Sequence, residues 1–333
     1  MPKRDFLRLT DLSRQELDDL LRRGIELKRQ WKTGRMSSAL AGKCLGLIFD
    51  KPSTRTRVSF EVAMGQLGGR SLYLEPGTTQ IKRGEPVADS ARVLSRYLDG
   101  LAIRTFDQEI IEEWARWATV PIINGLTNLL HPCQIFCDLL TLIEKRGSYR
   151  GLKLAYIGDG NNMANTWIEA ASMLDFTLTL ACPKGYEPDS GILREARRQP
   201  GVQIELTHDP FQAVEGADVV YTDVWASMGQ EREAKKRKRL FKGYQVNRRL
   251  LQRARRDAWV MHCLPAHVGE EISVEVLEGP QSVVFDQAES RLHGQKALLE
   301  WLLTRSAAPR FAWGGGDPKR RSRSTPGKPQ PSG

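Results

Sequence analysis

The stretch Lys51-Pro52-Ser53-Thr54-Arg55-Thr56-Arg57 joins a short apolar run to an apolar pattern with helical spacing. The run before it, residues 45–49, has the length and composition of a buried strand. Val58 and Val62 follow it about one helical turn apart, and Leu67 lies further along. The three hydroxyl residues and the proline of the stretch are typical of a helix start. The stretch therefore predicts a turn in which a strand leads into a helix.

Two arginines in this turn indicate that it binds an anion. Arg55 and Arg57 would face the positive end of the helix dipole, where cations are disfavoured. The same turn offers hydroxyl groups and free backbone N–H groups, and together with arginine these groups bind phosphate well. The alternative is an ordinary capped helix with two solvated arginines. Taken alone, the stretch leaves both interpretations open.

The remainder of the chain alternates strand-type runs with helical patterns. A capping box at Ser13-Arg14-Gln15-Glu16 opens a helix that we expect to end near Trp31. Further helices are expected over 134–145 and 162–174. Such alternation predicts parallel sheets with helices on both faces. The expected strands are residues 45–49, 71–74, 101–104, 120–124, 152–158, 177–181, 203–206, 219–222, 259–262 and 283–285.

The length of 333 residues suits two domains of about 150 residues each. A turn-rich segment at 147–151 separates two series of strands. We therefore predict an α/β fold in which two doubly wound parallel-sheet domains are joined by interdomain helices. The first domain is expected over residues 1–146, completed by a C-terminal helix over 288–306. The second is expected over residues 147–287, and residues 309–333 form a tail.

Half of the formal net charge of +10 lies in this tail. Residues 309–333 hold six basic residues and one acidic residue, together with five prolines and three consecutive glycines. This composition predicts a disordered segment. A second basic run, residues 235–239, is expected to be a solvated loop or helix face. Nucleic acid is therefore not expected as a main partner, and the remaining charge fits small anionic ligands.

Five cysteines without a Cys-x-x-Cys pair indicate reduced thiols and a cytoplasmic protein. His131, Cys133 and Cys137 could belong to a zinc site, but their spacing matches no recognised pattern and a fourth ligand is missing. No apolar run approaches the ~20 residues of a membrane span. The first residues lack the apolar core of a secretory signal. A membrane is therefore not expected as a partner.

Polar clusters follow several of the expected strands. In open α/β folds, ligands bind at the carboxyl ends of the strands, so these clusters mark the expected site. Each cluster alone has an ordinary explanation as a surface strand end, a helix cap or a strand terminator. The clusters are Arg104, His131-Pro132-Cys133-Gln134, Gly158-Asp159-Gly160-Asn161-Asn162, Asp223-Val224-Trp225-Ala226-Ser227-Met228-Gly229 and His262-Cys263-Leu264-Pro265.

Together with the Ser53–Arg57 turn, these motifs resemble the ornithine carbamoyltransferases, in the order found in that family, from about Leu12 to Leu303. The turn and the His131 motif are shared by carbamoyltransferases in general. The Ser227-Met228-Gly229 loop and the Cys263 motif are similar to those of the ornithine branch. The resemblance implies that carbamoyl phosphate and L-ornithine give L-citrulline and phosphate, by direct attack of the neutral δ-amine on the carbamoyl carbon.

The resemblance also implies a carbamoyl phosphate site. The Ser-Thr-Arg-Thr turn would hold the phosphate, whereas Arg57 completes the motif with either a binding or a structural role. Thr56, Arg104 and His131 would donate hydrogen bonds to the carbamoyl oxygen, as in an oxyanion hole. Gln134 and nearby backbone groups would bind the carbamoyl NH₂ group. The implied set is Ser53, Thr54, Arg55, Thr56, Gln80, Arg104, His131, Pro132, Cys133, Gln134, Cys263, Leu264 and Arg291.

The ornithine site implied by the resemblance lies in the second domain. Asp223 would hold the α-ammonium group, and Cys263 would lie beside Asp223 and the reacting amine. An ordinary small buried thiol is the alternative for Cys263, and no covalent nucleophile is needed because the amine attacks directly. The implied ornithine-binding residues are Asn162, Asp223, Ser227 and Met228, and the implied catalytic residues are Thr56, Arg104, His131 and Cys263.

The resemblance implies neither a metal nor an organic cofactor. In the family, the loop that carries Gln80 here reaches a neighbouring subunit's site, which implies a homotrimer with shared active sites. Further assembly beyond the trimer stays open, and so does the choice between arginine synthesis and arginine breakdown. The tail at 309–333 has no counterpart in the resemblance, and the basic stretch at 232–239 lies in a variable loop to which no function carries over.

Two alternatives from the sequence remain. A putrescine carbamoyltransferase shares much of the cysteine-loop chemistry, whereas an aspartate carbamoyltransferase would lack the Ser227-Met228-Gly229 and Cys263 motifs. An NAD-dependent dehydrogenase is the second alternative, since Gly158-x-Gly160 follows a strand and precedes a helix. The chain lacks the third glycine of the dinucleotide-binding pattern, because position 163 is Met163. It also has no acidic residue after the next strand.

Overall fold

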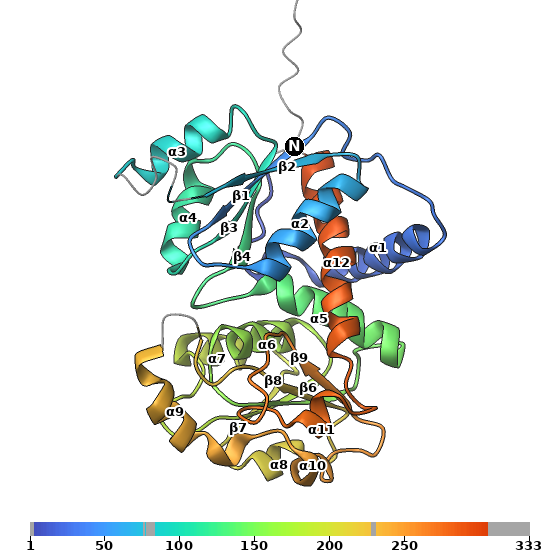
Figure 1. Ribbon diagram of the computed structural model, residues 1–333, viewed down its shortest axis with the longest axis vertical. Coiled ribbons are helices and arrows are strands. Elements are labelled where there is room, and N and C mark those ends of the chain that lie inside the picture. Colours follow the sequence, from blue (N-terminus) through green and yellow to red (C-terminus); the bar gives the residue numbers. More distant parts are fainter. Residues whose placement is uncertain (1–2, 76, 78–83, 228–230, 306–333) are drawn as a thin grey trace, which may run out of the picture.

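The structure, a computed structural model, describes residues 3–75, 77, 84–227 and 231–305. Figure 1 shows two lobes, each built around a parallel sheet, with helices α5 and α12 beside the junction between them. The predicted α/β fold with two parallel sheets is confirmed. No helix within the described ranges is both long and apolar enough to cross a membrane.

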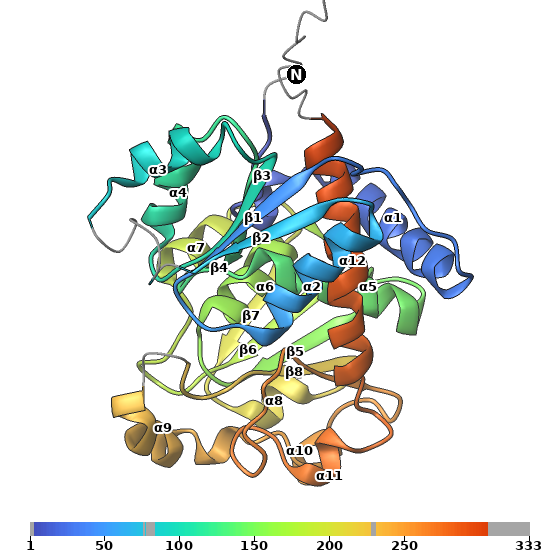
Figure 2. The same ribbon diagram turned by 45° about the horizontal axis from the view of Figure 1, so that its top comes forward.

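The first lobe holds a four-stranded parallel sheet in the order β2-β1-β3-β4. Its strands are β1 (Cys44–Phe49), β2 (Arg70–Leu74), β3 (Gly100–Arg104) and β4 (Ile122–Leu126). Helices α2 (Thr54–Gln66), α3 (Val87–Leu94) and α4 (Gln108–Trp117) belong to this lobe (Figure 2). Phe49 pairs with Arg104 across β1 and β3. The segment that begins at Lys51 therefore leaves the sheet level with Arg104.

The second lobe holds a five-stranded parallel sheet in the order β7-β6-β5-β8-β9. In β5, β8 and β9, Ile157 pairs with Thr222, and Thr222 pairs with His262. The segments that begin at Gly158, Asp223 and Cys263 therefore leave the sheet side by side. The strands are β5 (Lys153–Ile157), β6 (Thr177–Ala181), β7 (Gln203–Thr207), β8 (Val219–Thr222) and β9 (Trp259–His262).

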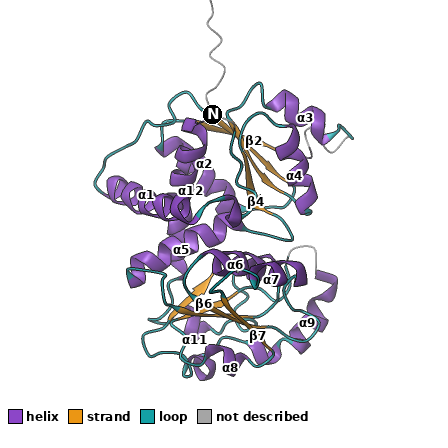
Figure 3. Ribbon diagram, turned by 180° about the vertical axis from the view of Figure 1, so that it is seen from behind, coloured by secondary structure: helices purple, strands orange, loops and turns teal. Residues whose placement is uncertain are grey.

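Two long helices, α5 (Pro132–Arg146) and α12 (Val284–Arg305), connect the two lobes, and α1 (Arg14–Lys32) packs against both of them. Helix α12 packs against α1, α2 and α5, so the end of the described chain returns to the first lobe, as Figure 3 shows from behind. The remaining α-helices are α6 (Asn162–Met173), α7 (Ser190–Ala196), α8 (Pro210–Val214), α9 (Ala234–Leu240), α10 (Arg248–Leu251) and α11 (Val274–Leu277). The 3₁₀ turns are η1 (Leu9–Asp11), η4 (Glu231–Glu233) and η5 (Lys242–Tyr244).

Two expected strands differ from the structure. The strand predicted at 283–285 is wrong, because only Ser282 forms an isolated bridge to Val260 and α12 begins at Val284. The Val283 carbonyl accepts the Gln287 N–H at 2.8 Å, which starts the helix four residues earlier than position 288. The strand predicted at 120–124 begins at Ile122, since the preceding Pro121 has no N–H to donate to the ladder.

Large aromatic rings fill the core of the second lobe below the strand ends. Tyr156 and Tyr221 stack with ring centroids 5.9 Å apart, and Trp167 meets Tyr221 edge-on at 5.5 Å. All three side chains are fully buried. Such rings contribute large buried area as well as specific stacking energy. They form a rigid floor under β5 and β8, where the polar segments of the site begin.

Candidate active site

A cavity of about 880 Å³ lies between the two lobes at the carboxyl ends of both sheets. This is where open parallel sheets bind their ligands. Most of the predicted site residues line it: Ser53, Thr54, Arg55, Thr56, Arg104, His131, Gln134, Asn162, Asp223, Ser227, Cys263, Leu264 and Arg291. The structure therefore brings together residues that lie up to 238 positions apart in the chain, from Ser53 to Arg291.

The turn before α2 presents one of its two arginines to the cavity. Ser53 caps the helix by accepting the Thr56 N–H at 3.2 Å, as its sequence position predicts. Arg55 lines the cavity, and burial lowers the pKa of its guanidinium. Arg57 turns away instead, pairs with Glu61 at 2.9 Å and stacks over the ring of Tyr73. The two arginines of the motif therefore have different environments.

Three guanidinium groups meet at one side of the cavity. Arg104 and Arg291 are buried, with 7% and 3% of their surface exposed, and Arg55 lies near both. Burial, followed by the charges of Arg291 and Arg55, lowers the pKa of Arg104 to about 10. Within the described ranges none of the three forms an ion pair, and the Nε atoms of Arg104 and Arg291 have no hydrogen-bond partner. Buried donors without partners are costly, so this group is built to receive an anion.

His131 lies against this cationic group as the residue before α5. Burial lowers the pKa of its imidazole well below the usual 6.5, and the charges of Arg291, Arg104 and Arg55 lower it further. The side chain is therefore neutral at physiological pH and can donate one N–H. Its backbone N–H donates to Thr166 Oγ1 on α6 at 2.9 Å, which ties this corner of the first lobe to the second.

The side of the cavity formed by the turn before α2, Arg104 and His131 is called the first wall here. Arg291 joins this wall to the last helix. Its Nη2 donates to Thr56 Oγ1 at 3.1 Å, and its Nη1 donates to Gln134 Oε1. The planar guanidinium thus contacts the turn before α2 and the first turn of α5 at once. Arg291 therefore reaches this wall from the last helix, and its contact with carbamoyl phosphate stays a prediction.

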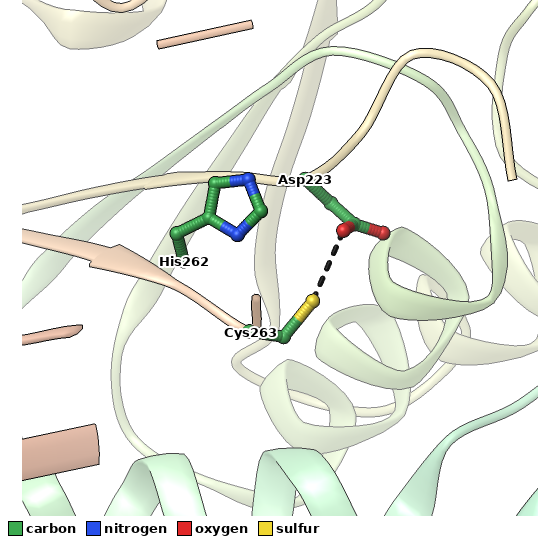
Figure 4. A group of neighbouring side chains, drawn as sticks. All are labelled: Asp223, His262 and Cys263. Atoms are coloured by element: carbon green, nitrogen blue, oxygen red, sulfur yellow. Dashed lines mark hydrogen bonds between the residues drawn. The ribbon is translucent and has the colours of Figure 1, made fainter. Parts of the chain in front are cut away.

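The second wall is the side of the cavity formed by the strand ends of the second lobe. Asp223 and Cys263 lie side by side on it (Figure 4). The thiol donates to Asp223 Oδ1 at 3.0 Å, and Asn161 Nδ2 donates to Asp223 Oδ2 at 2.8 Å. Burial, followed by the charge of Asp223, raises the pKa of Cys263 well above its usual 9. Cys263 is therefore a protonated hydrogen-bond donor rather than a thiolate nucleophile.

Asp223, His262 and Cys263 place three possible metal ligands within 4.8 Å of one another. Both ring nitrogens of His262 already have partners, however. Nδ1 accepts the Leu264 N–H at 2.9 Å, and Nε2 lies 3.1 Å from Glu271 Oε1. The ring would have to break one of these bonds to bind a metal, so the donor set does not fit a metal site. His262 instead fixes the Cys263-Leu264 segment, in which Leu264 has a φ of 58°.

The two neighbouring asparagines have different functions. Asn161 caps α6 through Oδ1 and holds Asp223 through Nδ2, although the sequence points to Asn162 as the ligand residue. Asn162 lines the cavity, and its Nδ2 donates to the Thr127 carbonyl at 2.7 Å. Adjacent identical residues give no sequence signal that separates these roles.

The cavity also contains residues outside the predicted set of site residues. Lys51 is buried, donates to Asn128 and lies over the ring of Phe106. Burial and the charge of Arg104 lower its pKa. Its place next to the Ser-Thr-Arg-Thr turn was the available signal. Other lining residues outside the predicted set are Asp159, Tyr186, Glu187, Pro265 and His267.

The basic run at 235–239 is only partly solvated, which corrects the expectation of a solvated face. Arg237 is buried, pairs with Asp159 at 2.8 Å and donates to the Trp225 carbonyl at 2.9 Å. It also lines the cavity. Its neighbours Lys236 and Lys238 are exposed. The ion pair with Asp159 is the reason why one cation of this run can be buried.

Four predicted residues are not among the described residues that line the cavity. Pro132 begins α5, and Cys133 is buried with its thiol donating to the Asn124 carbonyl at 3.3 Å. Their backbones are adjacent to His131, so a role for backbone groups stays a prediction. Gln80 and Met228 lie outside the described residues, as does the predicted disordered tail at 309–333.

Two family models match the chain, one on each side of the segment that joins the two sheets. Residues 4–144 match the carbamoyl-P binding domain of the aspartate/ornithine carbamoyltransferases, and residues 150–302 match their Asp/Orn binding domain. The chain belongs to the aspartate/ornithine carbamoyltransferase family. The resemblance drawn from the motifs is thereby confirmed.

Individual members of the aspartate/ornithine carbamoyltransferase family are similar over nearly their whole length. The chain is 58% identical to the ornithine carbamoyltransferase of Syntrophus aciditrophicus over 301 residues, which are 90% of this chain and 100% of that protein. The ornithine carbamoyltransferase of Pyrococcus furiosus superposes with a TM-score of 0.88 at 48% identity, covering 92% of this chain and 98% of that one. The anabolic ornithine carbamoyltransferase of Campylobacter jejuni superposes with a TM-score of 0.85 at 39% identity. The match covers 90% of this chain and 98% of that one.

These relatives also bear on the dehydrogenase alternative, which they do not support. The glycines that raised it have a structural explanation. A Cβ at Gly160 would lie 2.2 Å from the backbone of Glu187 and Pro188, so only glycine allows this close approach. Gly158 has a φ of 138°, which also favours glycine.

Proposed function

We propose that this protein is an ornithine carbamoyltransferase, which converts carbamoyl phosphate and L-ornithine into L-citrulline and phosphate. The observation that carries the proposal is the group of three arginines around a neutral histidine, at one end of a cavity whose other end holds Asp223. One end suits an anion and the other a cation. Carbamoyl phosphate and the α-ammonium of ornithine supply these charges in one reacting pair. The ornithine carbamoyltransferase relatives support the same choice.

Carbamoyl phosphate would bind at the first wall. Ser53, Thr54 and Arg55 would hold its phosphate through hydroxyls, backbone N–H groups and charge. Arg104 and His131 would donate to the carbamoyl oxygen, together with Thr56. The neutral state of His131 suits this role, because a neutral imidazole can donate a hydrogen bond without adding a fourth positive charge. Gln134 would accept a hydrogen bond from the carbamoyl NH₂ group.

Ornithine would bind at the second wall. Asp223 would hold the α-ammonium group, with Asn162 and Ser227 nearby on the cavity wall. The δ-amine would then extend toward Cys263 and the carbamoyl carbon. Because the Cys263 thiol is protonated and bonded to Asp223, it serves to place the carboxylate and to line the path of the amine. Met228 belongs to the same proposed set by its motif.

The reaction would proceed by direct attack of the uncharged δ-amine. A C–N bond forms at the carbamoyl carbon as the C–O bond to phosphate breaks, and the released phosphate can accept the proton that the nitrogen loses. Donors aimed at the carbamoyl oxygen stabilise the negative charge that develops there. The arginines stabilise the departing phosphate and also disfavour a protonated amine close to them.

The assignment of each lobe and the assembly belong to the same proposal. Residues 1–146 with α12 would form the carbamoyl phosphate domain, and residues 147–287 the ornithine domain. The Gln80 loop of one subunit would complete the site of another in a homotrimer, in the cytoplasm. Arg57, turned away from the cavity, would then have a structural role.

The proposal is tested by assaying the purified protein with carbamoyl phosphate and, in parallel, L-ornithine, putrescine and L-aspartate. Citrulline formation with ornithine, at a kcat/KM at least a hundredfold above the other two amines, is the expected result. A preference for putrescine, which keeps the second ammonium group of ornithine but lacks its α-carboxylate, would contradict the proposed amino-acid substrate. The trimer is tested separately by light scattering.

A further inference from the structure

A buried carboxylate below the cavity receives hydrogen bonds from three different elements. Asp138, on α5, is fully buried, and it does not line the cavity. Its Oδ1 accepts from Gln134 Nε2 at 2.8 Å and from Gln287 Nε2 at 2.9 Å. Its Oδ2 accepts the Tyr221 hydroxyl at 2.8 Å. Within the described part of the chain, Asp138 forms no ion pair.

The partners of Asp138 hold the carboxylate in place. Gln287, on α12, donates to Asp138 and to the Tyr221 hydroxyl, and its Oε1 accepts the His262 N–H at 2.9 Å. Gln287 and Tyr221 are themselves almost fully buried. Because the carboxylate is tied to both α12 and β8, it cannot turn away from Gln134 without leaving donors unpaired.

This carboxylate, together with Arg291, determines which end of the Gln134 amide faces the cavity. An ionised carboxylate only accepts hydrogen bonds, so Gln134 must turn its NH₂ toward Asp138. Its Oε1 then points to the cavity side, where it accepts from Arg291 Nη1. A carbonyl oxygen has two lone pairs, so one remains for a donor bound in the cavity. The carbamoyl NH₂ group of the proposed substrate is such a donor.

Stability alone does not explain a carboxylate at this position. Burial raises the pKa of Asp138 to about 6, although Tyr221, Gln134 and Gln287 oppose this shift. The ionised group is therefore costly here, and an apolar side chain of similar size is often as stable or more stable at such a site. The cost is understandable if the carboxylate orients a residue of the active site.

We propose that Asp138 is a positioning residue that acts through Gln134, so that the amide oxygen of Gln134 faces the carbamoyl NH₂ group. The inference rests on the proposed function. Without the carboxylate, only the contact with Arg291 still orients the Gln134 amide, whose NH₂ group has lost its acceptor. The amide oxygen is then held less firmly toward the carbamoyl NH₂ group. Binding of carbamoyl phosphate should suffer more than binding of ornithine.

Three variants separate this role from a structural one. Asp138→Ala removes the acceptor, and the KM for carbamoyl phosphate should rise at least tenfold while the KM for ornithine changes less than threefold. Asp138→Asn can keep Oδ1 as the acceptor and donate to the Tyr221 oxygen, so its loss should be several times smaller. Glu144→Ala is the matched control, since Glu144 bridges α5 to Lys28 of α1 and does not contact Gln134. This control should lower the melting temperature and leave the KM for carbamoyl phosphate unchanged.

A double-variant cycle gives the decisive measurement. If Asp138 acts through Gln134, Asp138→Ala should change kcat/KM for carbamoyl phosphate less than twofold in a Gln134→Ala background. Additive losses in the cycle, or an Asp138→Ala enzyme with the wild-type KM, would overturn the proposal. A wild-type enzyme that forms no citrulline would overturn the proposed function and this inference together, so the two failures are distinguishable.

A further variant serves if Asp138→Ala does not fold. Gln134→Glu keeps Asp138 and places a second carboxyl group beside it. The new carboxyl can donate to Asp138 only while it carries a proton. The kcat/KM of this variant for carbamoyl phosphate, relative to wild type, should therefore fall at least tenfold between pH 6 and pH 8.5. A pH profile parallel to that of the wild type would show that Asp138 does not set the orientation at position 134.

Discussion

Arg291 donates through Nη2 to the hydroxyl of Thr56 at 3.1 Å, although 235 residues separate the two in the chain. The contact joins the last helix to the turn that follows the first strand. The same guanidinium reaches Gln134 on α5 through Nη1. Thr56, Gln134 and Arg291 therefore hold one another in place before any ligand arrives, and such preorganisation lowers the cost of binding.

The first prediction concerns the shape of this guanidinium. Arg291→Lys keeps a positive charge but cannot donate to Thr56 and Gln134 at the same time, and it also lacks the unpaired Nε–H. The KM for carbamoyl phosphate should rise roughly tenfold, equivalent to about 1.4 kcal/mol. Calorimetric titration with carbamoyl phosphate measures the change directly. Equal affinity in the lysine variant would mean that only the charge of Arg291 matters.

The second prediction compares the two arginines of the turn before α2. Arg55→Ala removes a charge-assisted contact worth about 1.5–3 kcal/mol, so kcat/KM for carbamoyl phosphate should fall roughly ten- to hundredfold. Arg57→Ala, the matched control, loses an exposed pair with Glu61 and the stacking on Tyr73, both outside the cavity. Its kcat/KM should stay within about threefold of wild type. Comparable losses in both variants would contradict the division of roles that their environments indicate.

The third prediction concerns the one buried cation of the basic run. Arg237→Met leaves Asp159 without its partner and frees the Trp225 carbonyl, so the free energy of unfolding should fall by about 3 kcal/mol. The KM for ornithine should rise as well, because Trp225 lies two residues after Asp223. Lys236→Met, an exposed neighbour, should change neither quantity. Urea unfolding and steady-state kinetics of both variants check this expectation.

Much of the site could be predicted from the sequence because parallel sheets bring strand ends together. Once residues 45–49, 101–104, 219–222 and 259–262 are read as strands, the polar residues after them must gather at one edge of each sheet. The registers of Phe49 with Arg104 and of Thr222 with His262 show this directly. The family prediction, which used the same segments, is confirmed.

Other features depend on contacts that composition cannot show. Arg237 lies in a run of five basic residues, and only the fold brings Asp159 to it. Asn161 and Asn162 are identical neighbours, and the helix cap alone decides which of them holds Asp223. The strand expected at 283–285 failed because the β-branched and aromatic residues there, which favour a strand by composition, lie at the start of α12.

The fourth prediction concerns stability and pH. Glu169, on α6, accepts the Leu9 N–H at 3.1 Å, and burial raises its pKa to about 7 from the usual 4.5. The folded protein therefore binds this proton more tightly than the unfolded chain does. The stabilising effect is fully present below pH 4.5 and is lost as the pH rises through 7, at a total cost of about 3 kcal/mol.

Glu169→Gln removes this titration while it can keep the acceptor for Leu9. The melting temperature of the variant, relative to wild type, should therefore increase between pH 5 and pH 8, and scanning calorimetry at both pH values measures it. Melting temperatures that shift in parallel would show that the carboxyl of Glu169 does not titrate as its burial indicates.

The last prediction concerns the two ends of ornithine. The δ-amine, with a pKa near the ~10.4 of lysine in water, is mostly protonated at neutral pH. Arg55, Arg104 and Arg291 disfavour a further cation beside them, so binding should lower this pKa. Asp223, at the other wall, should instead favour the charged α-ammonium group. The kcat of the wild type should rise from pH 6.5 to pH 9 and then level off.

The Asp223→Asn variant tests the α-ammonium end of ornithine separately from the δ-amine. It removes the charge that faces the α-ammonium group, while its amide can retain one of the bonds to Cys263 and Asn161. The KM for L-ornithine should rise roughly thirtyfold, equivalent to about 2 kcal/mol, and the KM for carbamoyl phosphate less than threefold. The pH dependence of kcat should keep its shape, because the δ-amine and the arginines are unchanged. Equal increases in both constants, or a kcat that no longer rises with pH, would place Asp223 at the reacting amine instead of at the α-ammonium group.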